Sequence, residues 1–264
     1  MKYAFSLVVF GCMILIKAFG ADIYQPQSYM LCYEDQHFPP FVMGTSPAKA
    51  NEPGGILVEY VQRSAAQLGD NIVLVRYPWL RCQQAVKSGQ VDGLFAFIYS
   101  DERDQWAAFP KTNGRPDDRY SHLGRYVIFT AIDSSLTWDG TTLLPTSAVV
   151  QSIPGYIADK KLQDMGFKPV MNLQPKDALP LLANGRIDGF VMDELIGLTL
   201  IKQLGLEDKI TQLPVSFLDQ PWYVAFSKQR YEQDAQSIEA FWSAIAAIRE
   251  QNGADIIKSY LNTP

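Results

Sequence analysis

Apolar and polar positions in the first half of the chain follow two alternating periods. The runs at 29–35, 71–77 and 91–99 are short, apolar and rich in β-forming residues, which predicts strands. Between them, 56–69 has apolar residues at close to a 3.6-residue period, and 78–89 begins with proline; both end at glycine, which predicts helices. This β-α-β-α-β order predicts an α/β fold with a mainly parallel sheet covered by helices.

The second half of the chain repeats this order. It contains three predicted strands and two predicted helices, in the order 147–153, 156–166, 168–173, 175–185 and 187–193. The segments "SGQVDG" and "NGRIDG" occur at the same helix-to-strand junction in the two halves. We expect Gly89 and Gly185 to end these helices in the left-handed conformation. Two copies of one element order predict a pair of similar lobes.

Two extended segments, 123–133 and 220–229, lie outside the repeated units. If the chain enters the second lobe near residue 126 and leaves it near 221, two strands join the lobes and form a hinge beside a cleft. Ligands of open parallel sheets bind at the carboxyl ends of the strands, which places the predicted site in this cleft. Two helices, at 234–253 and 254–261, are predicted after the second crossing.

The predicted organisation has three parts. They are a signal peptide at 1–20, a first lobe formed by 21–125 plus 222–264, and a second lobe at 126–221 with the hinge strands at its ends.

The first twenty residues have the order of a secretory signal peptide. Lys2 precedes an apolar run from about residue 4 to 16, and small residues follow up to Ala21, which predicts cleavage after Gly20. A transmembrane anchor is the alternative, but the run is shorter than the ~20 residues that span a bilayer. We therefore expect a soluble protein exported to the periplasm.

Composition limits the partners. The formal net charge of the chain is −5, and it becomes −7 when Lys2 and Lys17 leave with the signal peptide. Because no block of lysine and arginine interrupts this acidic chain, nucleic acid is not expected as a partner.

Motifs typical of enzymes are missing from the sequence. It has no G-x-S-x-G, C-x-x-C, G-x-x-x-x-G-K-S/T or H-E-x-x-H. Its two histidines, His37 and His122, lie far apart in predicted polar loops, so we expect neither a metal site nor a cofactor. The sequence favours a binding protein over an enzyme.

Arg103, in the segment "YSDERDQWAAFP", follows the strand at 91–99 by a few residues. There its guanidinium could bind a carboxylate with two parallel hydrogen bonds in the cleft. A surface ion pair with Asp101 or Glu102 is the alternative, and spacing alone does not separate the two.

Asp193 ends the matching strand of the second lobe. Its carboxylate suits an ammonium group, and it also suits the N-cap of the following helix; both roles can hold together. For the pair Glu34 and Asp35, capping or solvation is the favoured interpretation.

Aromatic residues surround the predicted strand ends. Trp79 begins a helix after a strand, where it could form a wall of the cleft or pack inside the first lobe. Four further aromatic candidates for the cleft have weaker positional support: Phe38, Phe41, Tyr99 and Tyr156.

Several of these segments occur together in a known order. The segments are "YEDQHFPPF", "GILVEYVQRSAAQLG", "PWLRCQQAVKSGQVDGLFA", "SDERDQWAAFP", "GRIDGFVMDE" and "PWYVAFSK". In this the chain resembles the family 3 bacterial solute-binding proteins, which are periplasmic receptors of polar amino acid uptake with a type II periplasmic-binding fold. The resemblance implies two lobes, each a mainly parallel sheet flanked by helices, joined by a two-strand hinge.

The resemblance also implies roles for single residues. Ser100, Arg103 and Phe109 match the motif S/T-x-x-R-x-x-x-x-x-F, whose arginine takes the carboxylate of an amino acid ligand. Asp193, five residues after Asp188, has the spacing of the aspartate that takes the ammonium group. The residues that the resemblance and the strand ends together imply for ligand binding are Arg103, Asp193, Trp79, Asp35, Phe38, Tyr99, Ser100, Ser152 and Tyr156.

Two stretches depart from the family pattern. Phe97-Ile98-Tyr99 stands where members have small residues, which makes the wall beside Arg103 more apolar. In the second-lobe loop that contains Ser152 and Tyr156, Pro154 removes a main-chain donor.

The two cysteines that remain after export are Cys32 and Cys82. Oxidising compartments favour a bridge, and two buried free thiols are the alternative from composition alone. The strand order of the related fold places the second helix across the first strand, so the resemblance implies a Cys32–Cys82 disulfide.

The function that the resemblance implies is a monomeric receptor that captures an amino acid or related carboxylate and presents it to an inner-membrane ABC-type permease. A ligand-sensing subunit for a signalling protein is the alternative. An enzyme similar to the cyclohexadienyl dehydratases of this fold has less support, because no sequence feature indicates a perturbed acid beside a leaving group.

Overall fold

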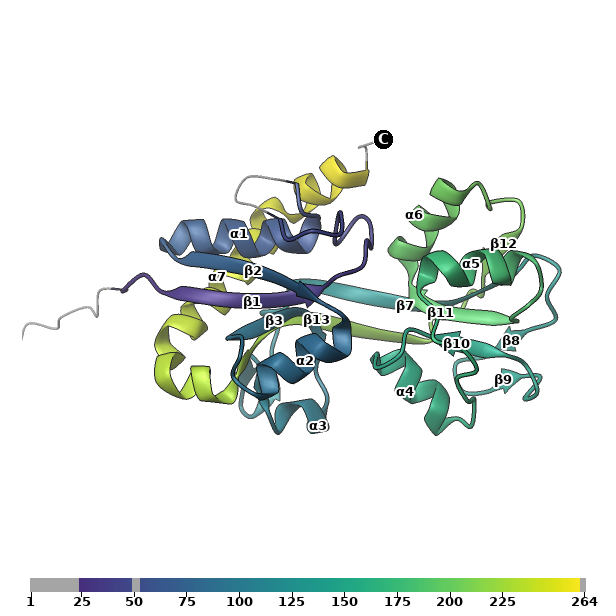
Figure 1. Ribbon diagram of the computed structural model, residues 1–264, viewed down its shortest axis with the longest axis horizontal. Coiled ribbons are helices and arrows are strands. Elements are labelled where there is room, and N and C mark those ends of the chain that lie inside the picture. Colours follow the sequence, from purple (N-terminus) through teal and green to yellow (C-terminus); the bar gives the residue numbers. More distant parts are fainter. Residues whose placement is uncertain (1–23, 49–52, 262–264) are drawn as a thin grey trace, which may run out of the picture.

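The computed structural model describes residues 24–48 and 53–261, which form two lobes joined by two long strands (Figure 1). The predicted signal peptide at 1–20 lies outside the described residues. None of the helices within these ranges is both long and apolar enough to cross a membrane.

The first lobe is built on three parallel strands with β1 in the middle. These strands are β1 (Ser28–Glu34), β2 (Asn71–Tyr77) and β3 (Gly93–Ile98). The helices of the lobe are α1 (Ile56–Leu68), α2 (Trp79–Lys87), the short α3 (Asp101–Asp104) and α7 (Lys228–Leu261). Three two-residue strands complete it: β4 (Ala107–Ala108), β5 (Lys111–Thr112) and β6 (Arg115–Pro116). The predicted β-α-β-α-β order is confirmed.

Helices cover both faces of the first-lobe sheet. In Figure 1, α1 and α7 lie on one face and α2 lies on the other. Trp242 of α7 is fully buried and donates its indole N–H to the carbonyl oxygen of Val224 at 2.7 Å. Under α2, Phe97 and Phe109 stack with their ring centroids 5.5 Å apart.

The second lobe contains the smaller part of the sheet. Its elements are β8 (Thr137–Trp138), β9 (Leu143–Leu144), β10 (Val150–Ser152), α4 (Ile157–Asp164), α5 (Pro175–Ala183), β11 (Gly189–Asp193), α6 (Glu194–Leu204) and β12 (Ile210–Gln212). β10 and β11 are parallel, as the prediction requires.

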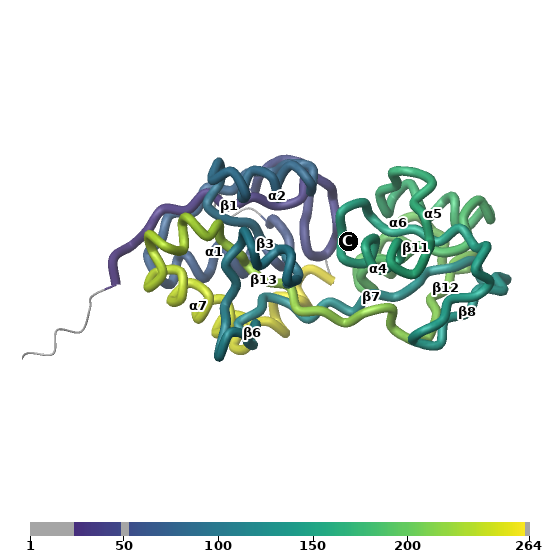
Figure 2. Tube along the Cα trace, turned by 90° about the horizontal axis from the view of Figure 1, so that it is seen from below, coloured from purple at the N-terminus to yellow at the C-terminus, as the bar shows by residue number. Residues whose placement is uncertain are grey.

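The two strands that join the lobes are β7 (His122–Ala131) and β13 (Leu218–Ser227). They pair antiparallel with Trp222 opposite His122 and Leu218 opposite Tyr126, and Figure 2 shows them side by side between the lobes. β13 also pairs with β3 and β7 with β11, so one mixed sheet runs through the described chain in the order β10-β11-β7-β13-β3-β1-β2. The two-lobed α/β fold with a two-strand hinge is confirmed, while the exact lobe boundaries stay a prediction.

The repeated helix-to-strand junction has the same structure in both lobes. Gly89 and Gly185 have φ angles of 70° and 63°, in the left-handed region predicted for them. The carboxylate of Asp92 accepts a hydrogen bond from the main-chain N–H of Met30 at 2.7 Å, and that of Asp188 accepts one from Val149 at 2.6 Å. Each aspartate thus joins the start of its own strand to the neighbouring strand, at the amino-terminal ends of the strands.

The strand predicted at 168–173 is wrong. This segment is a loop, and Val170 is 66% exposed. The main-chain N–H groups of Val170 and Met171 both donate to the side-chain oxygen of Gln151, at 3.0 and 2.9 Å. Because a β-ladder needs such donors and Pro169 supplies none, the segment does not join the sheet.

The predicted end of a helix at Gly253 is also wrong. α7 breaks at Asp234, where φ is −141°, and then continues through Gly253 to Leu261. A Cβ atom at Gly253 would lie 2.9 Å from the hydroxyl of Tyr60 on α1. Glycine here therefore allows α7 to pack closely on α1 instead of ending the helix.

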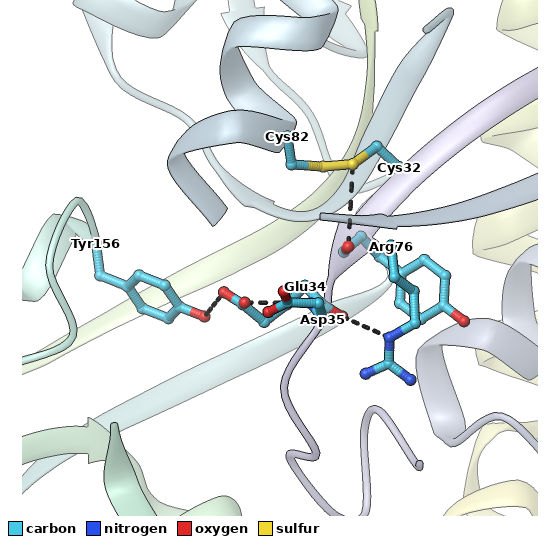
Figure 3. Close-up of a disulfide and its surroundings, with 7 residues drawn as sticks. Cys32, Glu34, Asp35, Arg76, Cys82 and Tyr156 are labelled. Atoms are coloured by element: carbon cyan, nitrogen blue, oxygen red, sulfur yellow. Dashed lines mark hydrogen bonds between the residues drawn. A yellow bond between two sulfur atoms is a disulfide. The ribbon is translucent and has the colours of Figure 1, made fainter. Parts of the chain in front are cut away.

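A disulfide joins the strand and the helix that the resemblance paired. Cys32 of β1 and Cys82 of α2 are bonded, with their Cα atoms 5.8 Å apart, and both are fully buried (Figure 3). The bond closes a loop of 50 residues that contains α1 and β2.

We predict that replacing both cysteines by alanine lowers the free energy of unfolding by about 2–5 kcal/mol, because the unfolded chain regains the freedom that the closed loop removes. Urea unfolding followed by tryptophan fluorescence measures this change. A reducing agent should shift the wild-type midpoint and leave that of the double variant unchanged. Equal midpoints for the wild type and the double variant, both measured without reducing agent, would contradict the prediction.

Candidate functional site

An enclosed cavity lies between the lobes. It leaves about 40 Å³ for the centres of water-sized molecules, which is room for only a few waters. Its lining is mainly aromatic and aliphatic and comes from both lobes and from the hinge: Tyr33, Glu34, Phe38, Phe41, Val42, Leu57, Trp79, Ala96, Tyr126, Ile153, Tyr156, Pro175, Met192, Asp193, Ile196 and Trp222. Glu34 and Asp193 are the charged side chains among these lining residues.

The two carboxylates occupy matching positions. Glu34 is the last residue of β1 and Asp193 the last residue of β11, so each stands at the carboxyl end of a strand that lies in a parallel pair. The arrow of β1 points toward the second lobe in Figure 1, and Glu34 and Asp193 line the same cavity. The cleft thereby receives one acid from each lobe.

Asp193 combines two roles. One carboxylate oxygen accepts hydrogen bonds from the main-chain N–H groups of Leu195 and Ile196, at 3.0 and 3.2 Å, and caps α6. The other oxygen lies 3.9 Å from Nε2 of His122 on β7. The side chain is 3% exposed, so the cap holds a buried carboxylate at the cavity.

Glu34 spans the space between the lobes. One of its carboxylate oxygens accepts a hydrogen bond from the hydroxyl of Tyr156 in the second lobe at 3.3 Å, and the other accepts one from the main-chain N–H of Asp35 at 3.2 Å (Figure 3). Burial, helped by neighbouring Asp35, raises the pKa of Glu34 to about 8. In this conformation the group therefore holds a proton at neutral pH.

Arg76 holds the loop that follows Glu34. Its guanidinium donates hydrogen bonds to the main-chain oxygens of Glu34, Gln36 and Met43, at 3.0, 2.7 and 2.9 Å, and it packs over the ring of Tyr33. A buried cation with these partners fixes the end of β1 and the turn after it. The position of Glu34 at the cavity thus depends on Arg76.

The cavity has an aromatic wall in each lobe and an aromatic floor on the hinge. Trp79 of the first lobe faces Tyr156 of the second, with ring centroids 5.6 Å apart. On the hinge strands, Tyr126 and Trp222 line the cavity, and their centroids are 6.1 Å apart. Burial raises the pKa of the Tyr126 and Tyr156 phenols, which keeps both as hydroxyl donors.

Arg103 does not line the cavity. Its guanidinium donates to the carbonyl oxygen of Ile98 at 2.8 Å and, across the cleft, to that of Gly155 at 3.2 Å, and it packs over the ring of Phe97 at 4.3 Å. Burial lowers its pKa to about 10, which leaves it charged at neutral pH. Among the described residues no carboxylate pairs with it, so the alternative ion pair with Asp101 or Glu102 is not found.

The remaining predicted residues divide into two groups. Trp79, Phe38, Tyr156 and Asp193 line the cavity. Four others lie outside the lining and make local hydrogen bonds: Ser100 caps the nitrogen of Arg103, Tyr99 donates to Asp101, Ser152 donates to the oxygen of Val191, and Asp35 accepts from Gln36.

Among the lining residues that the sequence did not place at the cleft are Glu34, Tyr126 and Trp222. Glu34 was interpreted as a capping or solvated acid, although its place at the end of a buried strand could have indicated the cleft. Trp222 lies opposite His122 on the hinge, and a Cβ atom at Gly124, two residues further along β7, would lie 2.5 Å from the indole nitrogen. The signal available in the sequence was a glycine on one predicted hinge strand and a tryptophan on the other.

His122 was expected in a polar loop, and that expectation is wrong. It begins β7 and packs between Phe41 and Trp222, with ring centroids 4.4 and 5.0 Å away. His37 is exposed and accepts a hydrogen bond from the main-chain N–H of Gly44 at 3.0 Å. In the part of the chain that the structure describes, no group of three or more histidine, cysteine, aspartate or glutamate side chains could hold a metal ion.

Comparison with known proteins agrees with this architecture. Residues 31–117 match the sequence profile of the bacterial extracellular solute-binding proteins, family 3. The resemblance to this family is confirmed. A search among curated protein sequences found no match.

Solved structures of the same fold cover nearly the whole chain. A histidine kinase sensor domain with similarity to periplasmic binding proteins shares 21% identity over 91% of this chain and 98% of its own, with a TM-score of 0.70. The GluR0 ligand-binding core from Nostoc punctiforme, in complex with L-glutamate, shares 16% over 90% and 100%, with a TM-score of 0.68. An ABC uptake transporter substrate-binding protein from Streptococcus pneumoniae with bound histidine shares 15% over 89% and 93%, with a TM-score of 0.68. These likenesses establish the fold.

The raised pKa of Glu34 leads to a prediction about stability and pH. Between about pH 4.5 and 8 the folded protein holds a proton on Glu34 that the unfolded chain has lost, so the free energy of unfolding falls as the pH rises through this window. Glu34→Gln should match wild type near pH 5 and exceed it by more than about 1 kcal/mol near pH 9.

Thermal unfolding measured from pH 5 to pH 9 tests this prediction. Glu207→Gln, which changes an exposed glutamate of the second lobe, is the control and should follow the wild-type curve. Parallel curves for wild type and Glu34→Gln would show that Glu34 ionises normally.

Proposed function

We propose that this protein is a periplasmic solute-binding receptor whose two lobes close on a small polar solute, in the class of amino acids and related compounds. One observation carries the proposal: the cavity between the lobes is enclosed by residues of both and receives a carboxylate from each, Glu34 and Asp193. A solute in this position touches both lobes at once. That is the condition for coupling binding to lobe closure.

Two hydrogen bonds and the ring contact of Trp79 with Tyr156 join the lobes across the cleft among the described residues. Arg103 donates to the Gly155 carbonyl and Tyr156 donates to Glu34. Gly155 has a φ angle of 79°, which favours glycine, and a Cβ atom there would lie 2.4 Å from the side chain of Leu80 in the first lobe. Two hydrogen bonds of this kind contribute about 1 kcal/mol each. A bound solute would then supply most of the free energy that favours closure.

Arg103 as the residue that takes a ligand carboxylate stays a prediction. Its charge lies close enough to influence the phenols of Tyr126 and Tyr156, both of which line the cavity. To bind a ligand, the guanidinium would release the carbonyl oxygen of Gly155 and donate instead to a carboxylate oxygen of the ligand.

A partner completes this function. Presentation of the closed form to an inner-membrane ABC-type permease is the first possibility, and the structural likeness to a substrate-binding protein of an ABC uptake transporter supports it. Delivery of the bound state to a signalling protein is the second, and it is supported by the likeness to a histidine kinase sensor domain.

One observation favours an enzymatic alternative. Glu34 is a buried acid with a raised pKa in an enclosed cavity, which is the state a general acid requires. Prephenate or arogenate would be the substrate for a reaction of the cyclohexadienyl dehydratase type, and product absorbance after mixing reports turnover directly. We favour binding, because proteins that share this fold and family are binding proteins.

We predict that one or a few compounds in a library of amino acids, amines and organic acids raise the melting temperature of the purified protein. A ligand at a hundred times its dissociation constant stabilises the folded state by about 2.7 kcal/mol. Differential scanning fluorimetry measures the shift, after unfolding and refolding to remove retained solute. Asp193→Asn should reduce it, because asparagine keeps the helix cap but loses the charge at the cavity.

Asp208→Asn is the matched control, since Asp208 is an exposed aspartate of the second lobe. It should keep the full ligand-induced shift. If no compound in the library changes the melting temperature, the receptor proposal fails.

A further inference from the structure

The charges around the cavity favour a cation. The two carboxylates of the lining are both buried, Glu34 at 6% and Asp193 at 3% exposure, and no lysine, arginine or histidine is among the described residues that line the cavity. A ligand carboxylate in this apolar enclosure would be repelled by Asp193 and would lose its hydration. An ammonium group would pair with the carboxylate of Asp193 and, by displacing to solvent the proton that Glu34 holds in this conformation, with that of Glu34 as well.

The aromatic rings support the same sign of charge. Two ring pairs line the cavity: Trp79 with Tyr156 and Phe41 with Trp222, with centroids 5.6 and 5.1 Å apart. The faces of such rings attract ammonium groups and accept the apolar body that carries them.

The nearby cation is already engaged. Arg103 spends its terminal nitrogens on the carbonyl oxygens of Ile98 and Gly155 and lies outside the lining. Its contact with Gly155 is itself one of the hydrogen bonds that hold the lobes together. A ligand carboxylate that took Arg103 would therefore break a closing contact as it formed.

From these observations we propose that the cavity selects a small organic ammonium ion with an apolar or aromatic body, held between Glu34 and Asp193, and that it needs no carboxylate on the solute. This deepens the proposed function and rests on it. Because the cavity in this conformation holds only a few waters, the lobes would open slightly to admit the solute, with its ammonium group between the two acids and its body against the rings of Trp79 and Tyr156. Arg103 would act in closing the lobes and would not touch the solute.

Pairs of compounds that differ by one carboxylate test this inference. The probes are phenethylamine with phenylalanine, tyramine with tyrosine, histamine with histidine, and agmatine with arginine. Isothermal titration calorimetry at pH 7.5 on refolded, solute-free protein gives each dissociation constant. We expect at least one amine to bind about tenfold more tightly than its parent amino acid, a difference of about 1.4 kcal/mol.

Two outcomes separate this inference from the proposed function. If an amino acid binds and its amine binds more weakly or not at all, the receptor proposal stands and the ammonium inference is overturned. If no member of any pair binds, the ammonium inference is overturned as well, and the wider compound library then decides on the receptor proposal independently.

Variants locate the interaction. Glu34→Gln and Asp193→Asn should each weaken amine binding about tenfold or more, the loss expected for one charge-assisted hydrogen bond, while Asp208→Asn should not. Arg103→Gln should change the affinities of an amine and its parent amino acid by the same factor, because its effect passes through lobe closure. A loss confined to the amino acid would show that Arg103 holds the carboxylate and would overturn the inference.

Discussion

The antiparallel pairing of β7 with β13 is the interaction on which the rest of the structure depends. These strands carry the sheet from one lobe into the other, and their ladder places Trp222 opposite His122. The same segment forms the floor of the cavity through Tyr126 and Trp222. Gly124 is needed because the indole of Trp222 lies where a larger side chain would stand. The hinge is therefore also part of the candidate binding site, and any change in the angle between the lobes acts on the cavity directly.

Burying two acids at the cavity costs free energy, and each acid offsets this cost in a different way. Glu34 meets the cost by holding a proton, and Asp193 meets part of it by capping α6. Neither solution supplies the full hydrogen bonding that a carboxylate has in water. In the proposed complex, a cationic group would pair with both acids once Glu34 released its proton, so the charge of the solute would favour lobe closure.

Much of the architecture could be predicted from local sequence patterns. Periodicity located the parallel strands and helices of the first lobe, and the repeated "DG" junction indicated two lobes because Asp92 and Asp188 perform the same task in each. The strand predicted at 168–173 failed for a tertiary reason: the side chain of Gln151, distant in sequence, takes the donors that a ladder would use. The prediction of a helix end at Gly253 was wrong for the same kind of reason, because glycine at this position serves the close contact with Tyr60 in another helix.

The residues of the candidate site can also be divided into those that the local sequence indicates and those that only the tertiary structure brings together. The sequence by itself determined the residue types at the strand ends, including Asp193 and Trp79, because position at the end of an apolar run is a local property. The tertiary structure alone decided that Glu34 meets Tyr156 and that Arg103 turns to the carbonyl of Gly155, because these contacts form between lobes far apart in the chain. Burial and charge pairing depend on every neighbour in space, and a linear pattern records only those neighbours that are also close in sequence.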